Sequence, residues 1–71
     1  MLDKKLLKAH MVLNDISVKA FADAQGWGTR KAYRKLNGET DFTVQEVQKS
    51  KELLHLDAPT TNKIFFADDL S

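Results

Sequence analysis

Apolar residues recur every three to four positions along the chain, a spacing that places them on one face of successive helices. Strands are not expected, because runs of β-branched residues that alternate with polar ones are few. With 71 residues and no cysteine, the chain must be stabilised by helices packed around one core rather than by disulfides. The sequence therefore predicts a single all-α domain over residues 1–71, a compact bundle of about five helices.

The first two helices are delimited by residues that favour helix ends. The first helix is expected to end near Asn14-Asp15, and its apolar stripe is formed by Leu2, Leu6, Leu7, Met11 and Leu13. Ser17 is well placed to cap the second helix, since its hydroxyl can accept a hydrogen bond from the first turn. Gly26 should end that helix, because glycine adopts a left-handed conformation without steric cost.

A third helix is expected over about residues 28–36, and it carries a dense cluster of cations. The cluster consists of Arg30, Lys31, Arg34 and Lys35. Ala32 and Leu36 share one face of this helix by their spacing of four residues, and the two arginines share the opposite face. The basic face is therefore expected to point away from the core.

The fourth helix has the clearest start signal. In Thr43-Val44-Gln45-Glu46, the side chains of the first and last residues can each bond the other's backbone N–H, which is a capping box. Phe42 and Val47 are placed to form its hydrophobic staple. The sequence predicts that this helix continues to about Leu56, with an apolar stripe formed by Val44, Val47, Leu53 and Leu54.

A last short helix is expected after Asp57-Ala58-Pro59, capped by Thr60 or Thr61. It ends with three bulky apolar residues, Ile64, Phe65 and Phe66. In the simplest interpretation these residues close the core. Because three consecutive side chains cannot all face inward from one short helix, a homodimer contact through them is the alternative.

Residues 16–38 resemble the helix-turn-helix of phage repressors and Cro proteins, the lambda-repressor-like group. The resemblance rests on Ala22 where the two helices meet, Gly26 in the turn, Trp27 just after it, and Asn37-Gly38 at the end. It places the helix-turn-helix at about residues 17–36. The longer run RKLNGETDFTVQEVQ, followed by NKIFF, is similar to short regulators of temperate phages of Gram-positive bacteria. The resemblance implies a buried Trp27.

The resemblance also implies a set of residues that contact DNA. Base-edge contacts are expected from Thr29 and Arg30, with Lys31, Tyr33 and Arg34 as further candidates. Phosphate contacts are expected from Ser17, Asn37 and Thr40. Arginine suits base readout, because its planar fork can donate two hydrogen bonds to guanine.

Three positions depart from the family's pattern. Val18 stands where a phosphate-contacting glutamine is common, and a valine cannot make that contact. Gln25 and Lys35 stand where apolar residues are common. The basic helix could also be only a solvated face. These departures leave a helix-turn-helix as the expected structure but weaken the prediction of tight DNA binding.

The resemblance implies a sequence-specific regulator of the Cro type that occupies a double-stranded operator and needs no cofactor. The alternative, from a different class, is an anti-repressor that binds a partner repressor and masks its DNA-reading surface. The net charge of +1, Val18 and the acidic pair Asp68-Asp69 favour this alternative. The sequence leaves both functions open.

Other function classes are not favoured. The carboxylates are scattered, with no nucleophile and base at a recognisable spacing, so an enzyme is not expected. His10 and His55 fall on different predicted helices without a partner motif, so no metal site is expected. No apolar run approaches the roughly 20 residues of a membrane span, and the chain start lacks a signal-peptide core. The expected location is the cytoplasm of a bacterial host cell, on the nucleoid when the protein is bound to DNA.

Overall fold

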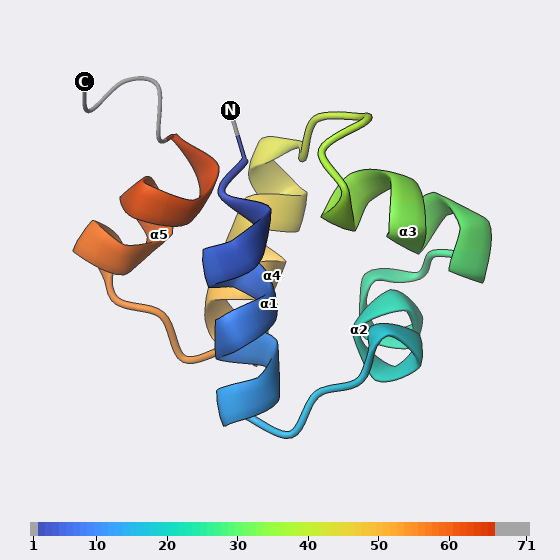
Figure 1. The fold of residues 1–71 in the computed structure, drawn as a ribbon, viewed down its shortest axis with the longest axis horizontal. Helices are drawn as coiled ribbons and strands as arrows, with labels where there is room; N and C mark the ends of the chain where they lie inside the picture. Colours follow the sequence, from blue (N-terminus) through green and yellow to red (C-terminus); the bar gives the residue numbers. More distant parts are fainter. Residues whose placement is uncertain (1, 67–71) are drawn as a thin grey trace.

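Five α helices follow one another along residues 2–66, the part of the chain that the computed structural model describes (Figure 1). They are α1 (Lys4–Leu13), α2 (Val18–Gln25), α3 (Thr29–Leu36), α4 (Val44–Leu53) and α5 (Ala58–Phe65). This part of the chain contains no strand, so the prediction of an all-α fold with five helices is confirmed. None of these helices has the length and apolar character needed to cross a membrane.

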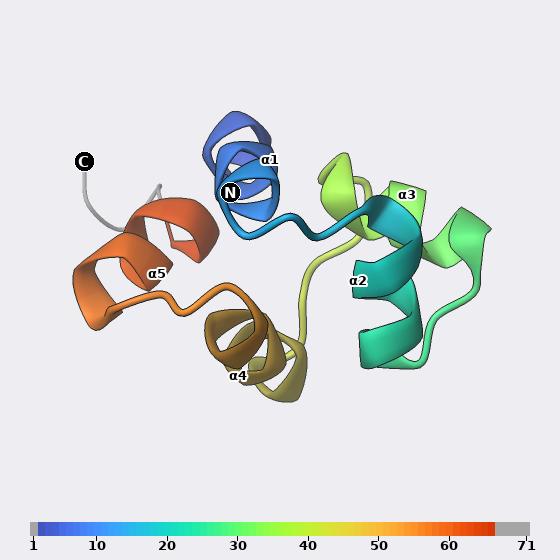
Figure 2. The ribbon, with the colours of Figure 1, turned by 90° about the horizontal axis from the view of Figure 1, so that it is seen from below.

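The helices surround one core, and their pairings define the shape of the molecule. Helix α1 packs against α3 and α5, while α4 packs against α2 and α5. Figures 1 and 2 show α5 at one side of the molecule and the pair α2 and α3 at the other, with α1 and α4 between them. Helices α2 and α3 cross steeply and are joined by a turn of three residues, 26–28. A steep crossing and a short turn are the geometry expected of the predicted helix-turn-helix.

Side-chain caps begin four of these five helices. The caps are Asp3, Ser17, Thr43 and Asp57, and each accepts a hydrogen bond from the backbone N–H three residues later. The predictions for Ser17 and for the capping box of α4 are confirmed: Glu46 N–H lies 3.1 Å from Thr43 Oγ1, and Thr43 N–H lies 2.9 Å from Glu46 Oε1. Helix α3 begins after Gly28, which offers no side-chain cap.

The capping box of α4 leads to the first prediction. Thr43→Ala removes one acceptor at the helix start and is expected to lower the free energy of unfolding by about 0.5–2 kcal/mol. Because Thr43 is exposed and lies outside α3, the affinity for DNA or a protein partner should not change at temperatures where the domain stays folded. Urea titration and binding measurements on the same variant check both statements. Loss of binding by a folded variant would place Thr43 on the recognition surface.

The prediction that Thr60 or Thr61 caps the last helix is wrong. Asp57 is the cap, because its Oδ1 accepts from the N–H of Thr60 at 2.8 Å. Hydrogen bonds from the Thr60 side chain and from the Thr60 N–H lower the pKa of Asp57 below its usual value of 3.8. Pro59 then occupies the first turn, where its missing N–H costs nothing. Thr61 lies inside the helix and donates its hydroxyl to the carbonyl of Asp57 at 2.7 Å.

One predicted helix boundary and two residues of the predicted apolar stripes also need correction. Helix α4 ends at Leu53 rather than near Leu56, since His55 adopts a left-handed backbone with φ of 52°. Val44 and Leu13, which were expected on apolar stripes, are exposed. The predicted end of α2 is confirmed, because Gly26 has φ of 80° and closes the helix in the left-handed conformation.

The core is contributed by α1, α2, α3 and α5 and by the segments that join the helices, and Val47 and Leu53 of α4 are partly buried against it. Its buried apolar residues are Leu7, Met11, Phe21, Ala22, Trp27, Ala32, Leu36, Leu54, Leu56, Ile64 and Phe65. Trp27 is only 6% exposed, which confirms that it is a core residue. Its ring centroid lies 5.9 Å from that of Phe21 and 5.5 Å from that of Phe42. The aromatic contacts continue from Phe42 to Phe65, at 4.9 Å.

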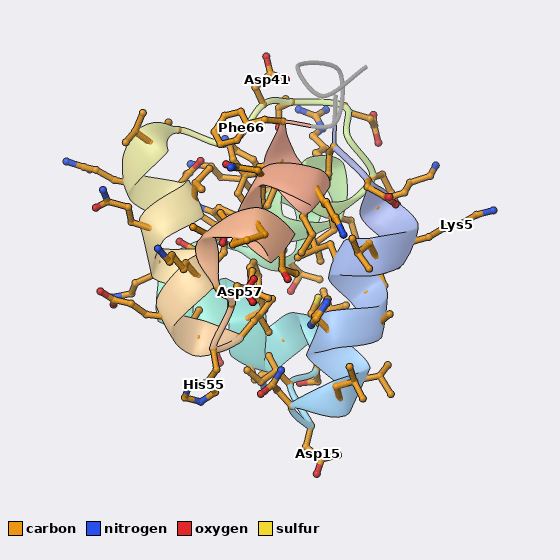
Figure 3. All side chains as sticks on the ribbon, turned by 90° about the vertical axis from the view of Figure 1, so that its left-hand side faces the viewer. Lys5, Asp15, Asp41, His55, Asp57 and Phe66 are labelled. Carbon is orange, nitrogen blue, oxygen red and sulfur yellow. The ribbon has the colours of Figure 1, made fainter. Side chains whose placement is uncertain are left out.

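The burial of α5 limits which of its apolar residues could take part in the predicted homodimer contact. Ile64 and Phe65 are buried in the core, so these two side chains are not available to a second copy of the chain. Phe66, which is labelled in Figure 3, is 42% exposed. Of the three residues predicted as a dimer contact, only Phe66 therefore offers apolar surface.

Candidate nucleic-acid interface

Helix α3 is attached to the rest of the molecule along one face. Ala32 and Leu36 are buried on that face, as their spacing predicts, and α3 packs against both α2 and α1. Gly28, with an extended backbone, leads the chain out of the turn and into the helix. The opposite face of α3 is therefore left to solvent along its whole length.

The residues predicted to read DNA bases all lie on this solvent side. Thr29, Arg30, Lys31, Tyr33 and Arg34 are exposed, and Tyr33 keeps 52% of its surface accessible. The three cations among them make no ion pair with any residue of the described part of the chain. Their charges are therefore available to an external anion.

A shallow hollow beside α3 brings one predicted phosphate contact next to these cations. It has a volume of about 530 Å³ and is lined by Arg30, Lys31, Arg34, Lys35 and Thr40. Thr40 comes from the loop between α3 and α4, so the hollow lies along the flank of α3 that faces this loop. A hydroxyl beside several cations provides the donors that a phosphate oxygen accepts from.

The other two predicted phosphate contacts lie at helix ends. Ser17 is exposed at the start of α2, where its Oγ accepts from the N–H of Ala20 and its hydroxyl proton is still available for donation. Asn37 is exposed at the end of α3, and its Oδ1 accepts from Lys8 Nζ at 3.5 Å. Lys8, on α1, was not predicted as part of the site. Lys8 and Asn37 are 29 residues apart in the sequence, and the packing of α1 on α3 brings their side chains together.

Lys35 is the one member of the basic cluster that does not belong to the exposed face. It is only 7% exposed, and its Nζ lies 2.8 Å from Glu46 Oε1. The same ammonium donates to the carbonyl of Asp41. It also lies 5.8 Å from the ring centroid of Trp27, a distance at which a cation is attracted to the ring. The ion pair with Glu46 on α4 thus explains how a lysine can occupy this buried position, where an apolar residue was expected.

Glu46 connects the helix-turn-helix to α4 through both of its carboxylate oxygens. Oε1 accepts from Lys35 and from the N–H of Thr43, and Oε2 accepts from Trp27 Nε1 at 3.0 Å. Burial raises the pKa of Glu46, but the hydrogen bonds from Lys35, Thr43 and Trp27 together outweigh it and hold the pKa below the usual 4.5. The carboxylate is therefore ionised at neutral pH and holds α3 and the turn against α4.

Gln25 completes this polar contact between α2 and α4. Its Nε2 donates to Ser50 Oγ at 2.9 Å and to the carbonyl of Glu46 at 3.2 Å. The two departures from apolar residues, Gln25 and Lys35, thus have partners on the same helix. The sequence signal that could have revealed this contact was the pair of polar residues at positions expected to be buried.

The two histidines lie apart from the basic face. His10 is half-buried on α1, and His55, labelled in Figure 3, is exposed in the segment after α4. Residues 2–66 contain no group of three His, Asp or Glu side chains that could hold a metal ion. No protein-family model, curated protein or solved structure matches the chain.

Proposed function

We propose that the protein is a sequence-specific DNA-binding regulator of the Cro type, which reads an operator with α3. One observation carries this proposal. The exposed face of α3 presents Arg30, Lys31 and Arg34 without ion-pair partners in the described chain, on a helix whose opposite face is buried. A short basic helix fixed at a steep angle to its predecessor can enter the major groove, which is about 12 Å wide.

The contacts divide by position on α3. Arg30 and Arg34, one turn apart, can donate paired hydrogen bonds to guanine O6 and N7. Lys31 and Thr40, which line the hollow beside these two arginines, are assigned to the phosphate backbone. In this proposal the bound protein acts by occupying its operator and obstructing or redirecting polymerase, which requires no cofactor.

The attachment of α3 supports precise readout. Lys35, in the last turn of α3, is bonded to Glu46 of α4, and Leu36 is buried in the core. These contacts fix the backbone of α3, which carries the long side chains of the exposed face. Helix α3 is therefore already ordered before it binds DNA. A recognition element that is ordered in advance loses less entropy on association.

The second prediction tests base readout by Arg30. Arg30→Ala is expected to weaken binding to the preferred site by about 1–3 kcal/mol and to relax the preference at one base pair, because a bidentate contact is lost. Arg30→Lys is the matched control, since it keeps the charge but not the planar fork. The Arg30→Lys protein should retain its affinity for random DNA but lose most of the preference for one base pair at the contacted position. Equal binding by all three proteins would show that Arg30 does not read a base.

The deciding experiment is a titration of the purified protein with its own intergenic region and with random DNA at about 0.1 M salt. At that ionic strength charges are screened beyond roughly 10 Å, so non-specific attraction is reduced. Saturable binding at least about a thousandfold tighter than to random DNA supports the proposal. Equal binding to both kinds of DNA overturns it.

An anti-repressor is the second candidate, and two observations favour it. Tyr33 is half-exposed between the arginines of the same face, and tyrosine and arginine are enriched at hot spots of protein interfaces. Val18, at the start of α2, is half-buried against the core and offers no donor to a phosphate. A complex with a phage repressor that depends on Arg30, formed by a protein without DNA preference, would establish this function instead.

A further inference from the structure

Lys8 lies outside the helix-turn-helix but beside the end of its second helix. Its Nζ is 3.5 Å from Oδ1 of Asn37, the residue that caps the C-terminal end of α3. Both residues are exposed. In Figures 1 and 2 the C-terminal end of α3 is the end that lies toward α1, which agrees with the packing of these two helices. The fold thus adds a cation from α1 to the surface that α3 presents.

The ammonium of Lys8 keeps donors for another partner. It has three protons, and the long contact with Asn37 engages one of them. No carboxylate of residues 2–66 lies within ion-pair distance of Lys8. This differs from Lys35, whose ammonium is buried and occupied by Glu46 and Asp41. Lys8 is therefore able to neutralise a charge on a molecule that approaches α3.

Lys8 and Lys31 lie on opposite flanks of the base-reading residues Arg30 and Arg34. At roughly 100° per residue, Asn37 and Lys31 are separated by about 120° around α3, with Arg30 and Arg34 between them. Lys31 lies at one edge of this arc, where the hollow that it lines with the two arginines is closed by Thr40, and Asn37, the partner of Lys8, lies at the other edge. A duplex presents the same order of features, because the bases in the major groove have a phosphate backbone on each side.

We propose that Lys8, together with Asn37, binds a phosphate of the DNA backbone on the flank of α3 opposite Lys31. This inference rests on the proposed function and deepens it, since it makes α1 part of the interface. The partner is then a duplex whose two backbones are contacted at once. Phosphate contacts of this kind fix the register of the protein on DNA without reading sequence.

A purely structural role for Lys8 makes a different prediction. A cation near the C-terminal end of a helix interacts favourably with the helix dipole, so Lys8 could only stabilise the end of α3. Its removal would then lower the melting temperature without changing the number of counterions released on binding. The dependence of affinity on salt separates the two roles, because each neutralised phosphate contributes about 0.9 to the slope of log K against log salt concentration.

The experiment compares Lys8→Gln with Lys63→Gln, which removes the same charge from α5. Figures 1 and 2 place α5 at the side of the molecule away from α3, and Lys63 is exposed. Each protein is titrated with a short duplex from the flanking genomic region and with a random duplex of equal length, over a range of salt concentrations. Arg30→Ala and the wild type are measured alongside, and melting curves give the folded fraction of each.

Lys8→Gln is expected to weaken binding to both duplexes by roughly three- to tenfold at about 0.1 M salt and to reduce the salt slope by about one unit. Lys63→Gln should leave the slope unchanged. If the two glutamine variants behave alike, or if the loss disappears after correction for the folded fraction, the role of Lys8 is overturned. The proposed function then still stands, provided that Arg30→Ala loses site preference. If the wild type prefers no duplex, the proposed function itself has failed, and the role of Lys8 fails with it.

Discussion

Trp27→Ala is expected to lower the free energy of unfolding by about 3–5 kcal/mol, the range for deletion of a large aromatic side chain from a core. The side chain is 6% exposed and is in aromatic contact with Phe21 on α2 and with Phe42 before α4. Its removal leaves a cavity between the helix-turn-helix and the rest of the core. At about 0.05–0.15 kcal/mol per residue, this loss is a large part of the total stability of so small a domain.

The indole N–H adds a second contribution that a control variant can separate. Trp27 Nε1 donates to Glu46 Oε2, so truncation also removes a donor from a largely buried carboxylate. Trp27→Phe keeps an aromatic ring but not this donor, and it should lose less stability than Trp27→Ala. Urea unfolding followed by circular dichroism measures both variants. A midpoint that hardly moves for Trp27→Ala would show that the side chain does not belong to the core.

The sequence predicted the parts of the fold that depend on local signals. The capping box at Thr43, the cap at Ser17 and the left-handed Gly26 each follow from the chemistry of a few neighbouring residues, and the structure has all three. The buried face of α3 followed from the spacing of Ala32 and Leu36. The cap of α5 was predicted wrongly although its signal is local, because aspartate and threonine both favour the N-cap position and Asp57 stands only three residues before Thr60.

The candidate site was predicted less completely, because part of it depends on contacts between distant segments. Side-chain type and helical spacing place Arg30 and Arg34 on the exposed face, and that placement is confirmed. They do not show that Lys35 turns inward, because its partner Glu46 lies 11 residues away in another helix. Side-chain type and spacing also do not place Lys8 beside Asn37, because that contact depends on the packing of α1 on α3.

The second large effect is expected at the ion pair that fixes α3 to α4. Glu46→Gln removes the negative charge that faces Lys35 while nearly keeping the side-chain volume. The ammonium is then left largely buried without a counterion, and removal of one partner of a buried pair costs about 3–5 kcal/mol. We expect about 3 kcal/mol, at the lower end, because the Glu46 side chain keeps 16% of its surface exposed.

A double-mutant cycle identifies the pair as the source of this loss. Lys35→Met replaces the ammonium with an apolar side chain of similar length beside Trp27 and Phe42. If the two charges stabilise each other, the double variant Lys35→Met/Glu46→Gln should be more stable than the sum of the single losses predicts, by about 1 kcal/mol or more. Strict additivity would show that the single losses come from altered packing and not from the ion pair.

The pH dependence of stability gives an independent check on Glu46. Its pKa in the folded protein lies below the value of 4.5 expected for the unfolded chain. A carboxylate with a lowered pKa contributes stability above the unfolded pKa, and that contribution is lost as the pH falls through the folded pKa. The wild type should therefore lose stability as the pH falls below about 4.5, and Glu46→Gln should lose less over the same interval because it has no proton to bind at this position. Parallel stability curves for the two proteins between neutral pH and pH 3 would mean that the hydrogen bonds from Lys35, Thr43 and Trp27 do not stabilise the ionised carboxylate.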